Sequence, residues 1–216
     1  MKYYFAPMEG ITGPIHRKAF DACFPGVDKY FTAFIAPNQK GKFSAREKKD
    51  IDPENNRGIF LIPQIMTNDA GDFTVTALQL ESLGYKEVNL NLGCPSRTVV
   101  SKYRGSGFLA IPDKLERFLD DVFTDRDKKM PDMRISIKTR IGKDDPDEFE
   151  RLLEIYNRYP LEELIVHPRT QQDFYQGRPD MKAFGYAAEK GKSPVCYNGD
   201  ILTVGDLNRF TSAYPQ

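Results

Sequence analysis

Five polar side chains stand where predicted strands, mostly apolar, meet the loops that follow them: Gln64, Asn91, Lys138, His167 and Asn198. Side chains two residues apart on a strand face the same side, so Asn91 shares a face with Asn89, and Lys138 with Ser136. In parallel α/β folds the carboxyl ends of the strands meet at one end of the fold. We therefore expect these side chains to form one polar ring there.

The chemistry of this ring limits what it can bind. It offers neutral hydrogen-bonding groups, one lysine and one histidine, with Arg169 nearby, and it lacks the carboxylate cluster of most metal sites. Neither GxGxxG nor a Walker A motif is present, which disfavours a Rossmann or P-loop site. A flat ring rich in heteroatoms, such as a flavin, would suit these groups, and Lys138 could stabilise the anionic reduced form near N1/O2. Each residue alone is more often structural, but five at successive strand ends are harder to explain that way.

A second candidate feature is the stretch NLNLGCPSRTVVSKYRGSG, residues 89–107. Cys94 lies where its strand-like run ends, and Arg97, Lys102 and Arg104 follow within the next loop. Such cations could contact a polyanion locally, or they could be no more than a solvated basic loop.

The other two cysteines, Cys23 and Cys196, lie far from the first, and the chain has no CxxC pair. This spacing argues against a disulfide framework and against a structural zinc site. We expect both to be small buried residues, one on an apolar helix face and one inside a strand.

The elements that must position these residues alternate between strands and helices. A new strand begins roughly every 30 residues, the size of one strand plus one helix, and a repeated βα order implies a parallel sheet. An open doubly wound sheet and a (β/α)8 barrel both remain possible at this point. The seven predicted strands span residues 2–6, 29–35, 59–65, 87–92, 134–139, 163–167 and 194–198.

The helical segments are amphipathic or carry end signals. Apolar residues recur at i, i+3, i+4 and i+7 in 112–123 and 146–156. Gly84 is a natural residue just after a helix, and Thr203 is a natural N-cap.

Bulk composition indicates one globular domain over residues 1–216. Thirty-one Lys and Arg balance 31 Asp and Glu, so any polyanion must be held by a local patch rather than by net charge. The sequence shows no apolar run of membrane-spanning length and no signal-peptide pattern, so we expect a cytoplasmic protein.

Six motifs together resemble the tRNA-dihydrouridine synthases, in that family's order and across nearly the whole chain. The most specific is NLGCP followed by a basic loop containing glycine. The resemblance implies an FMN-dependent (β/α)8 barrel that reduces selected uridines of tRNA, with NADPH as the usual electron source. The motifs are APMEGIT (6–12), PQI (63–65), NLNLGCPS (89–96), IKTRIG (137–142), VHPRT (166–170) and NGDI (198–201).

The resemblance also implies roles for individual residues. Cys94 would be the general acid, giving a proton to C5 of the uracil ring while reduced flavin gives hydride to C6; a thiol with an ordinary pKa of about 8.5 is mostly protonated at neutral pH. The implied FMN contacts are Ala6, Pro7, Met8, Gln64, Asn91, Lys138, His167, Asn198, Gly199 and Asp200. The implied substrate contacts are Asn91, Arg97, Lys102, Arg104 and Arg169.

The chain departs from the family pattern near its end, where an eighth strand with a phosphate-binding Gly-Arg-Gly and a helical tRNA-binding domain are not seen. We expect an incomplete barrel of about seven βα units, with an open seam between the first and seventh strands, weaker binding of the FMN phosphate and impaired tRNA binding.

Three alternatives stay open. They are another FMN barrel reductase of a free pyrimidine or an enone, a non-catalytic tRNA-binding or scaffold fragment without flavin, and a (β/α) enzyme that uses a sugar phosphate without flavin.

Overall fold

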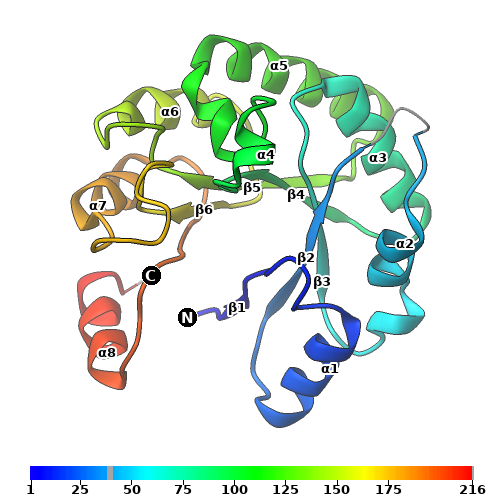
Figure 1. Ribbon diagram of the computed structural model, residues 1–216, viewed down its shortest axis with the longest axis horizontal. Coiled ribbons are helices and arrows are strands. Elements are labelled where there is room, and N and C mark those ends of the chain that lie inside the picture. The colour runs from blue at the N-terminus through cyan, green and yellow to red at the C-terminus, as the bar shows by residue number, and fades with distance from the viewer. Residues whose placement is uncertain (38–40, 216) are drawn as a thin grey trace.

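The computed structural model describes residues 1–37 and 41–215, where parallel strands alternate with helices around one curled sheet (Figure 1). The strands are β1 (Tyr4–Phe5), β2 (Lys29–Ile35), β3 (Leu61–Ile65), β4 (Glu87–Leu92), β5 (Arg134–Arg140), β6 (Leu164–His167) and β7 (Val195–Tyr197). The α-helices are α1 (Pro14–Cys23), α2 (Ala45–Ile51), α3 (Ala70–Ser82), α4 (Arg97–Val100), α5 (Pro112–Lys129), α6 (Glu148–Tyr156), α7 (Met181–Lys190) and α8 (Val204–Ala213). Two 3-10 helices, η1 (Glu54–Asn56) and η2 (Gly105–Ala110), complete the described elements.

Strand order in the sheet follows the chain without reversal, from β1 to β7, and every neighbouring pair is parallel. A doubly wound sheet would reverse its strand order at a switch point. The uninterrupted order and the curl in Figure 1 are those of a (β/α)8-type barrel with seven strands among the described residues. The barrel prediction is confirmed, and the doubly wound alternative is wrong.

The open seam expected between the first and seventh strands is present. β1 and β7 are the two edges of the sheet and do not pair with each other. A groove of about 600 Å³ lies between them, and aromatic residues including Tyr4, Phe31, Phe210 and Tyr214 line it.

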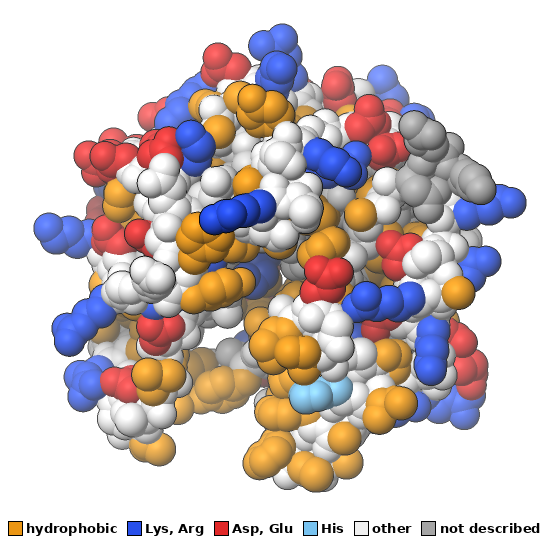
Figure 2. Space-filling view, in the orientation of Figure 1, with side chains coloured by type: hydrophobic (Ala, Val, Ile, Leu, Met, Phe, Trp, Pro, Cys, Tyr) orange, Lys and Arg blue, Asp and Glu red, His pale blue; other side chains and the backbone are white. Residues whose placement is uncertain are grey.

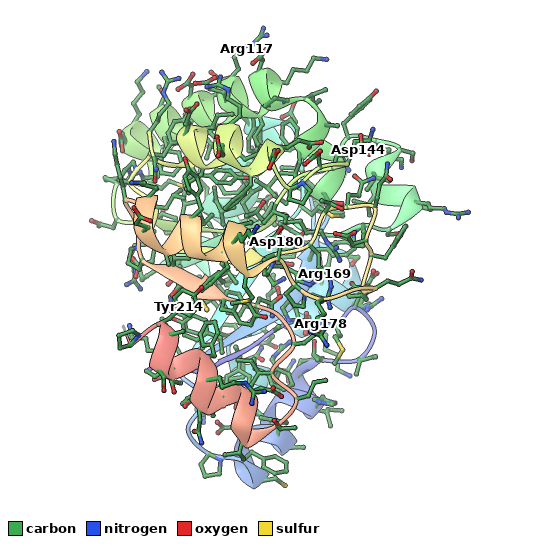
Figure 3. The ribbon with its side chains drawn as sticks, turned by 90° about the vertical axis from the view of Figure 1, so that its left-hand side faces the viewer. Arg117, Asp144, Arg169, Arg178, Asp180 and Tyr214 are labelled. Carbon is green, nitrogen blue, oxygen red and sulfur yellow. The ribbon has the colours of Figure 1, made fainter. Side chains whose placement is uncertain are left out.

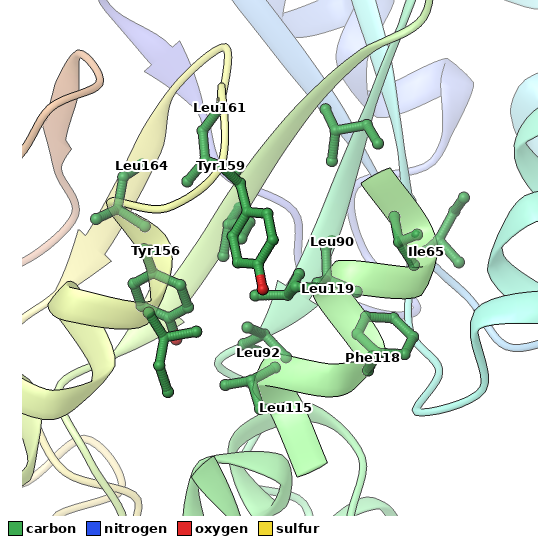
Figure 4. Packing of buried hydrophobic residues seen from close by; sticks show 14 of the residues in the cluster. Ile65, Leu90, Leu92, Leu115, Phe118, Leu119, Tyr156, Tyr159, Leu161 and Leu164 are labelled. Carbon is green, nitrogen blue, oxygen red and sulfur yellow. The ribbon is translucent and has the colours of Figure 1, made fainter. Parts of the chain in front are cut away.

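The strands alternate between a helix-facing side and an inward side. In β4, Val88, Leu90 and Leu92 belong to the large apolar core, and Figure 4 shows Leu90 and Leu92 packed beside Leu115 and Leu119 of α5. Burial of such side chains stabilises the fold by roughly 1.5–3 kcal/mol each.

The inward side carries polar groups and a small apolar cluster. Phe31, Ile62 and Ile165 form this second cluster inside the curl. At the strands' amino-terminal end, Lys29 Nζ lies 3.0 Å from Glu87 Oε1. The polar ring lies at the opposite, carboxyl-terminal end of this inward side.

Most sequence predictions of elements are confirmed. Two strands, 29–35 and 87–92, have the predicted bounds, and Thr203 caps α8 by accepting a 3.1 Å hydrogen bond from the Asp206 amide. Gly84 follows α3 with φ of 96°. The strand predicted at 2–6 is only Tyr4–Phe5, because it pairs with β2 on one side alone.

The expectation that Cys23 is buried is wrong. The Phe20 ring packs on Phe5 of β1, with ring centroids 4.5 Å apart, whereas Cys23 is the last residue of α1 and is exposed. Cys196 is half-buried within β7. No helix in the described part of the chain has both the length and the apolar character needed to cross a membrane.

Candidate active site

A cleft of about 520 Å³ lies at the carboxyl ends of the strands, a size suited to a small ligand. Figure 2 shows that this face of the molecule is hollowed, with hydrophobic side chains at the rim. The structure brings the five polar strand-end residues together here, as expected. The predicted residues among its lining are Ala6, Pro7, Met8, Gln64, Asn91, Cys94, Lys138, His167 and Asn198.

Amide side chains from β3 and β4 form a hydrogen-bonded ladder at the base of the cleft. Asn91 Nδ2 donates to Gln64 Oε1 at 2.6 Å, and Gln64 Nε2 donates to Asn89 Oδ1 at 2.9 Å. Asn89 Nδ2 in turn donates to Ser136 Oγ at 2.9 Å. These bonds fix the orientation of the Gln64 amide, and its second N–H can still serve a ligand.

The same ladder holds the cysteine loop in place. Asn91 Oδ1 accepts from the backbone amides of Gly93 and Cys94 at 3.1 and 3.0 Å. From the other side, both the amide and the hydroxyl of Ser106 donate to the Cys94 carbonyl at 3.0 Å. Cys94 therefore sits on a backbone held from two directions.

Glycine is required where η2 packs against this loop. Gly105 has φ of 54°, and a Cβ there would lie 2.7 Å from the Cys94 carbonyl oxygen. Only a residue without a side chain permits this approach without strain. The glycines after the basic loop thus support the thiol-bearing segment from behind.

The surroundings of the Cys94 thiol favour its protonated form. Its side chain is partly buried, and that burial raises the pKa of the thiol from its ordinary value. A thiol held protonated at the wall of a cleft can act as a proton donor.

Lys138 extends from β5 into the cleft, and no hydrogen bond or ion pair to its Nζ occurs among the described residues. Burial, with a smaller contribution from the positive charge of Arg140, lowers the pKa of this ammonium from 10.5 to about 8. A cation without a partner beside neutral hydrogen-bonding groups favours a ligand that presents negative charge.

The residues near the ends of β6 and β7 divide into two sets. His167 and Asn198 line the cleft, whereas Gly199 lines the groove between β1 and β7. Arg169 lies behind the cleft wall with 3% of its surface exposed, and its Nη2 lies 2.6 Å from Asp200 Oδ2. The structure therefore does not bring Arg169, Asp200 or Gly199 into the cleft with the others.

The three cations after Cys94 do not line the cleft itself. Arg97 on α4 and Lys102 just after it are exposed, while Arg104 is half-buried with Nε 3.4 Å from Asn68 Oδ1. Arg97 and Lys102 are thus available to a large partner that approaches the cysteine loop, and Arg104 is partly engaged.

Sequence reasoning missed Arg140 and Tyr175. Arg140 Nε donates to the Gly93 carbonyl at 2.9 Å, Nη1 donates to the Thr170 carbonyl at 2.7 Å, and its guanidinium lies 5.2 Å from the Tyr175 ring centroid. It therefore joins the cysteine loop to the loop after β6. The strand period could have found it, because Arg140 is two residues after Lys138 and faces the same side.

Comparison with known proteins agrees with this geometry. The model of the family described as dihydrouridine synthase (Dus) matches residues 4–214. Morphinone reductase has a TM-score of 0.62 at 10% identity, covering 93% of this chain and 76% of that structure. An old yellow enzyme homologue from Zymomonas mobilis has a TM-score of 0.61 at 10% identity, covering 98% and 82%. Both structural likenesses concern the barrel fold alone.

Curated relatives carry related names. A probable tRNA-dihydrouridine synthase of Staphylococcus aureus (strain COL) is 27% identical over 176 residues, which cover 79% of this chain and 50% of the relative. The tRNA-dihydrouridine synthase B of Pasteurella multocida (strain Pm70) is 24% identical over 203 residues, covering 94% and 59%. The chain spans about half the length of the S. aureus relatives it matches. With a family model matched over nearly its whole length, the chain belongs to the dihydrouridine synthase family.

Proposed function

We propose that this chain binds FMN in the cleft and reduces the C5–C6 bond of uridine in tRNA to give dihydrouridine, with NADPH as the electron source. Membership of the dihydrouridine synthase family and the names of its curated relatives support this activity. The observation that carries the proposal is that Cys94, whose thiol pKa is raised by burial, lines one cleft with Lys138, which has no partner among the described residues.

The residues present fit FMN. Lys138 would receive the negative charge that develops at N1/O2 on reduction, and Gln64 would donate its free N–H to the pyrimidine edge. The short side chains of Ala6 and Pro7 leave one wall of the cleft apolar, as a flat ring requires. In this proposal His167 lies beside the ring, Met8 lines it, and Asn198 lies toward the ribityl and phosphate end. Gly199 lies next to it in the adjoining groove, and Asp200 is paired with Arg169 rather than with FMN.

Cys94 supplies the proton. Bound FMN, once reduced, would supply the hydride for C6 of the uracil ring. Cys94 Sγ holds a proton that can pass to C5, and the hydrogen bonds of Asn91 and Ser106 to its backbone keep the thiol at the cleft wall. Because burial raises the pKa of the thiol, Sγ keeps its proton until a uracil ring enters the cleft.

A macromolecular substrate fits the exposed cations better than a free pyrimidine does. Arg97 and Lys102 lie outside the cleft, where a single base would not reach them. Phosphates on either side of a uridine extruded into the cleft could contact both. Asn91, which lines the cleft beside Cys94, would contact both the flavin and the base.

The test measures single-turnover reduction of unmodified tRNA transcript by chain loaded with FMN and reduced by NADPH. Replacing Cys94 by Ala should slow formation of dihydrouridine by about 10²–10⁴-fold, the usual contribution of a positioned general acid. Flavin absorbance should bleach with NADPH equally well in the variant, because the thiol has no part in that half-reaction.

Cys23→Ala is the matched control, because that thiol is exposed at the end of α1 and does not line the cleft. It should leave the rate unchanged. Reduction of free uracil or an enone, with no reduction of tRNA, would favour a small-molecule reductase. A folded chain that takes up no FMN would contradict the proposal at its first step.

A further inference from the structure

Every N–H of the Arg169 guanidinium is engaged inside the protein. Nε donates to the Gln176 carbonyl at 3.2 Å, and Nη2 donates to the Gly177 carbonyl at 2.7 Å and to Asp200 Oδ2 at 2.6 Å. Nη1 lies 3.1 Å from Asp200 Oδ1 and 3.0 Å from His167 Nε2. An arginine has five N–H donors, so none remains for a substrate.

The contact between Arg169 and His167 decides where the imidazole proton lies. A guanidinium can only donate, so the Nε2 atom that faces it must accept and therefore carries no proton. The neutral ring then has its proton on Nδ1. Burial is the main reason that the pKa of His167 falls from 6.5 to about 3, with the charges of Arg140 and Lys138 as further causes, so the ring stays neutral near pH 7.

The free edge of the imidazole is available to the cleft. His167 lines the cleft, and its Nδ1 has no hydrogen-bond partner among the described residues. Nε2 is occupied by Arg169, which leaves Nδ1 as the ring nitrogen for a ligand. The ring thus offers one donor and no acceptor to whatever the cleft holds.

Asp200 fixes the arginine that does this. Its two carboxylate oxygens accept one hydrogen bond each from Nη1 and Nη2 of Arg169, and this bidentate geometry sets the plane of the guanidinium. Arg169 comes from the loop after β6 and Asp200 from the loop after β7, so the pair also joins these loops. Figure 3 shows Arg169 close to the start of α7, near Asp180.

We propose that Arg169, held by Asp200, is a positioning residue that keeps His167 in the tautomer with its proton on Nδ1. It acts through the histidine and does not contact substrate, in contrast to the role that the family resemblance implied for it. The proposal rests on the proposed function for the acceptor, a flavin heteroatom, but the tautomer itself requires no ligand.

The chain offers a direct measurement, because it has only two histidines, His16 and His167. Nitrogen-15 NMR of the histidine-labelled chain without FMN separates protonated from unprotonated ring nitrogens, and His16→Gln assigns the two sets of signals. We expect His167 to show a protonated Nδ1 and an unprotonated Nε2 from pH 5 to pH 8. A proton on Nε2 in the wild-type chain overturns the proposal.

Variants then test the cause. Arg169→Met should shift the His167 signals toward a mixture of both tautomers, and Asp200→Asn, which leaves the arginine in place, provides the same test if the first variant does not fold. Arg178→Met, an exposed arginine on the same loop, is the control and should change nothing. Unchanged His167 tautomers in the folded variants would overturn the proposal.

FMN titration adds a second readout. Loss of one well-formed hydrogen-bond donor should weaken FMN binding by about tenfold in Arg169→Met. Absence of FMN binding by the wild-type chain would contradict the proposed function and leave the tautomer result intact, so the two failures are distinguishable.

Discussion

The charge of Lys138 should make ligand binding depend on pH. In the free protein burial lowers the pKa of Lys138 to about 8, and a hydrogen-bond acceptor at the N1/O2 edge of bound FMN would raise that pKa again. Binding then takes up a proton at high pH, so FMN affinity should change little below pH 7, fall about twofold by pH 8 and fall by up to tenfold per pH unit above it. Fluorescence titration of FMN across this range measures the slope.

Lys138→Met is the control for this prediction, because it keeps the unbranched stem and removes the charge. The variant should bind FMN more weakly at pH 7, and its affinity should not change across pH 8. The same loss of affinity with pH in the variant would show that another group titrates. Without ligand, the pKa of Lys138 is lower in the folded chain, about 8, than its ordinary value of 10.5. Burial of the charged ammonium therefore lowers the free energy of unfolding by its whole amount below pH 8, and this loss shrinks as pH rises toward 10.5.

For single residues, the sequence predicted which side chains share the polar ring but not which hydrogen-bond partner each one has. Gln64, Lys138 and His167 were placed in one ring because strand ends and the two-residue period decide position. The partners of Arg169 could not be predicted, because Asp200 follows a different strand and its approach depends on how two loops fold. Side-chain hydrogen bonds between loops have no sequence period to reveal them.

Among the helices and strands, too, some were predicted from the sequence and others were not. Strands 29–35 and 87–92 were predicted with their observed bounds because they lie within the sheet, where burial on both faces leaves a clear apolar pattern. The short helix α4 and the 3-10 helix η2 were not predicted. Tertiary contacts with the cysteine loop shape these segments, and both are too short to show a helical period.

A prediction at the scale of elements concerns the contact of η2 with the cysteine loop. Gly105→Ala should lower the free energy of unfolding by about 2–4 kcal/mol, since it combines a left-handed backbone with a crowded carbonyl. The matched control is Gly41→Ala, whose glycine has nearly the same φ, 57°, but no atom of the described residues within 4 Å of the added Cβ. It should cost only about 1–2 kcal/mol. Urea unfolding measures both, and equal losses would show that the close packing does not matter.

At the scale of the whole molecule, the βα repeat predicted a parallel sheet, and the family resemblance selected the barrel from the two parallel architectures that the repeat left open. The seam between β1 and β7 follows from the seven strands counted in the sequence, and the structure contains it. The position of the neighbouring groove could not be predicted, because its walls come from both edge strands and from α8. Such a surface exists only once the sheet has curled.

Balanced charge over the whole molecule makes a prediction about its RNA partner. With 31 basic and 31 acidic residues, the chain has no general attraction for tRNA, and binding must depend on a few local cations. Each phosphate contact contributes about −0.7 to −0.9 to the slope of log affinity against log salt concentration. If Arg97 and Lys102 are such contacts, the slope should be shallow, about −1.4 to −2.7 for two or three phosphates in all.

Single substitutions separate these cations from the rest of the surface. Arg97→Ala and Lys102→Ala should each make the slope shallower by about one, with similar losses on different tRNA sequences, because phosphates carry no sequence information. Arg117→Ala is the control, since this exposed arginine lies on α5 at the edge of the molecule in Figure 3. A steep slope that all three substitutions leave unchanged would place the RNA on another surface. If the wild-type slope is shallow and Arg97→Ala and Lys102→Ala leave it unchanged, these two cations are solvated and do not contact phosphates.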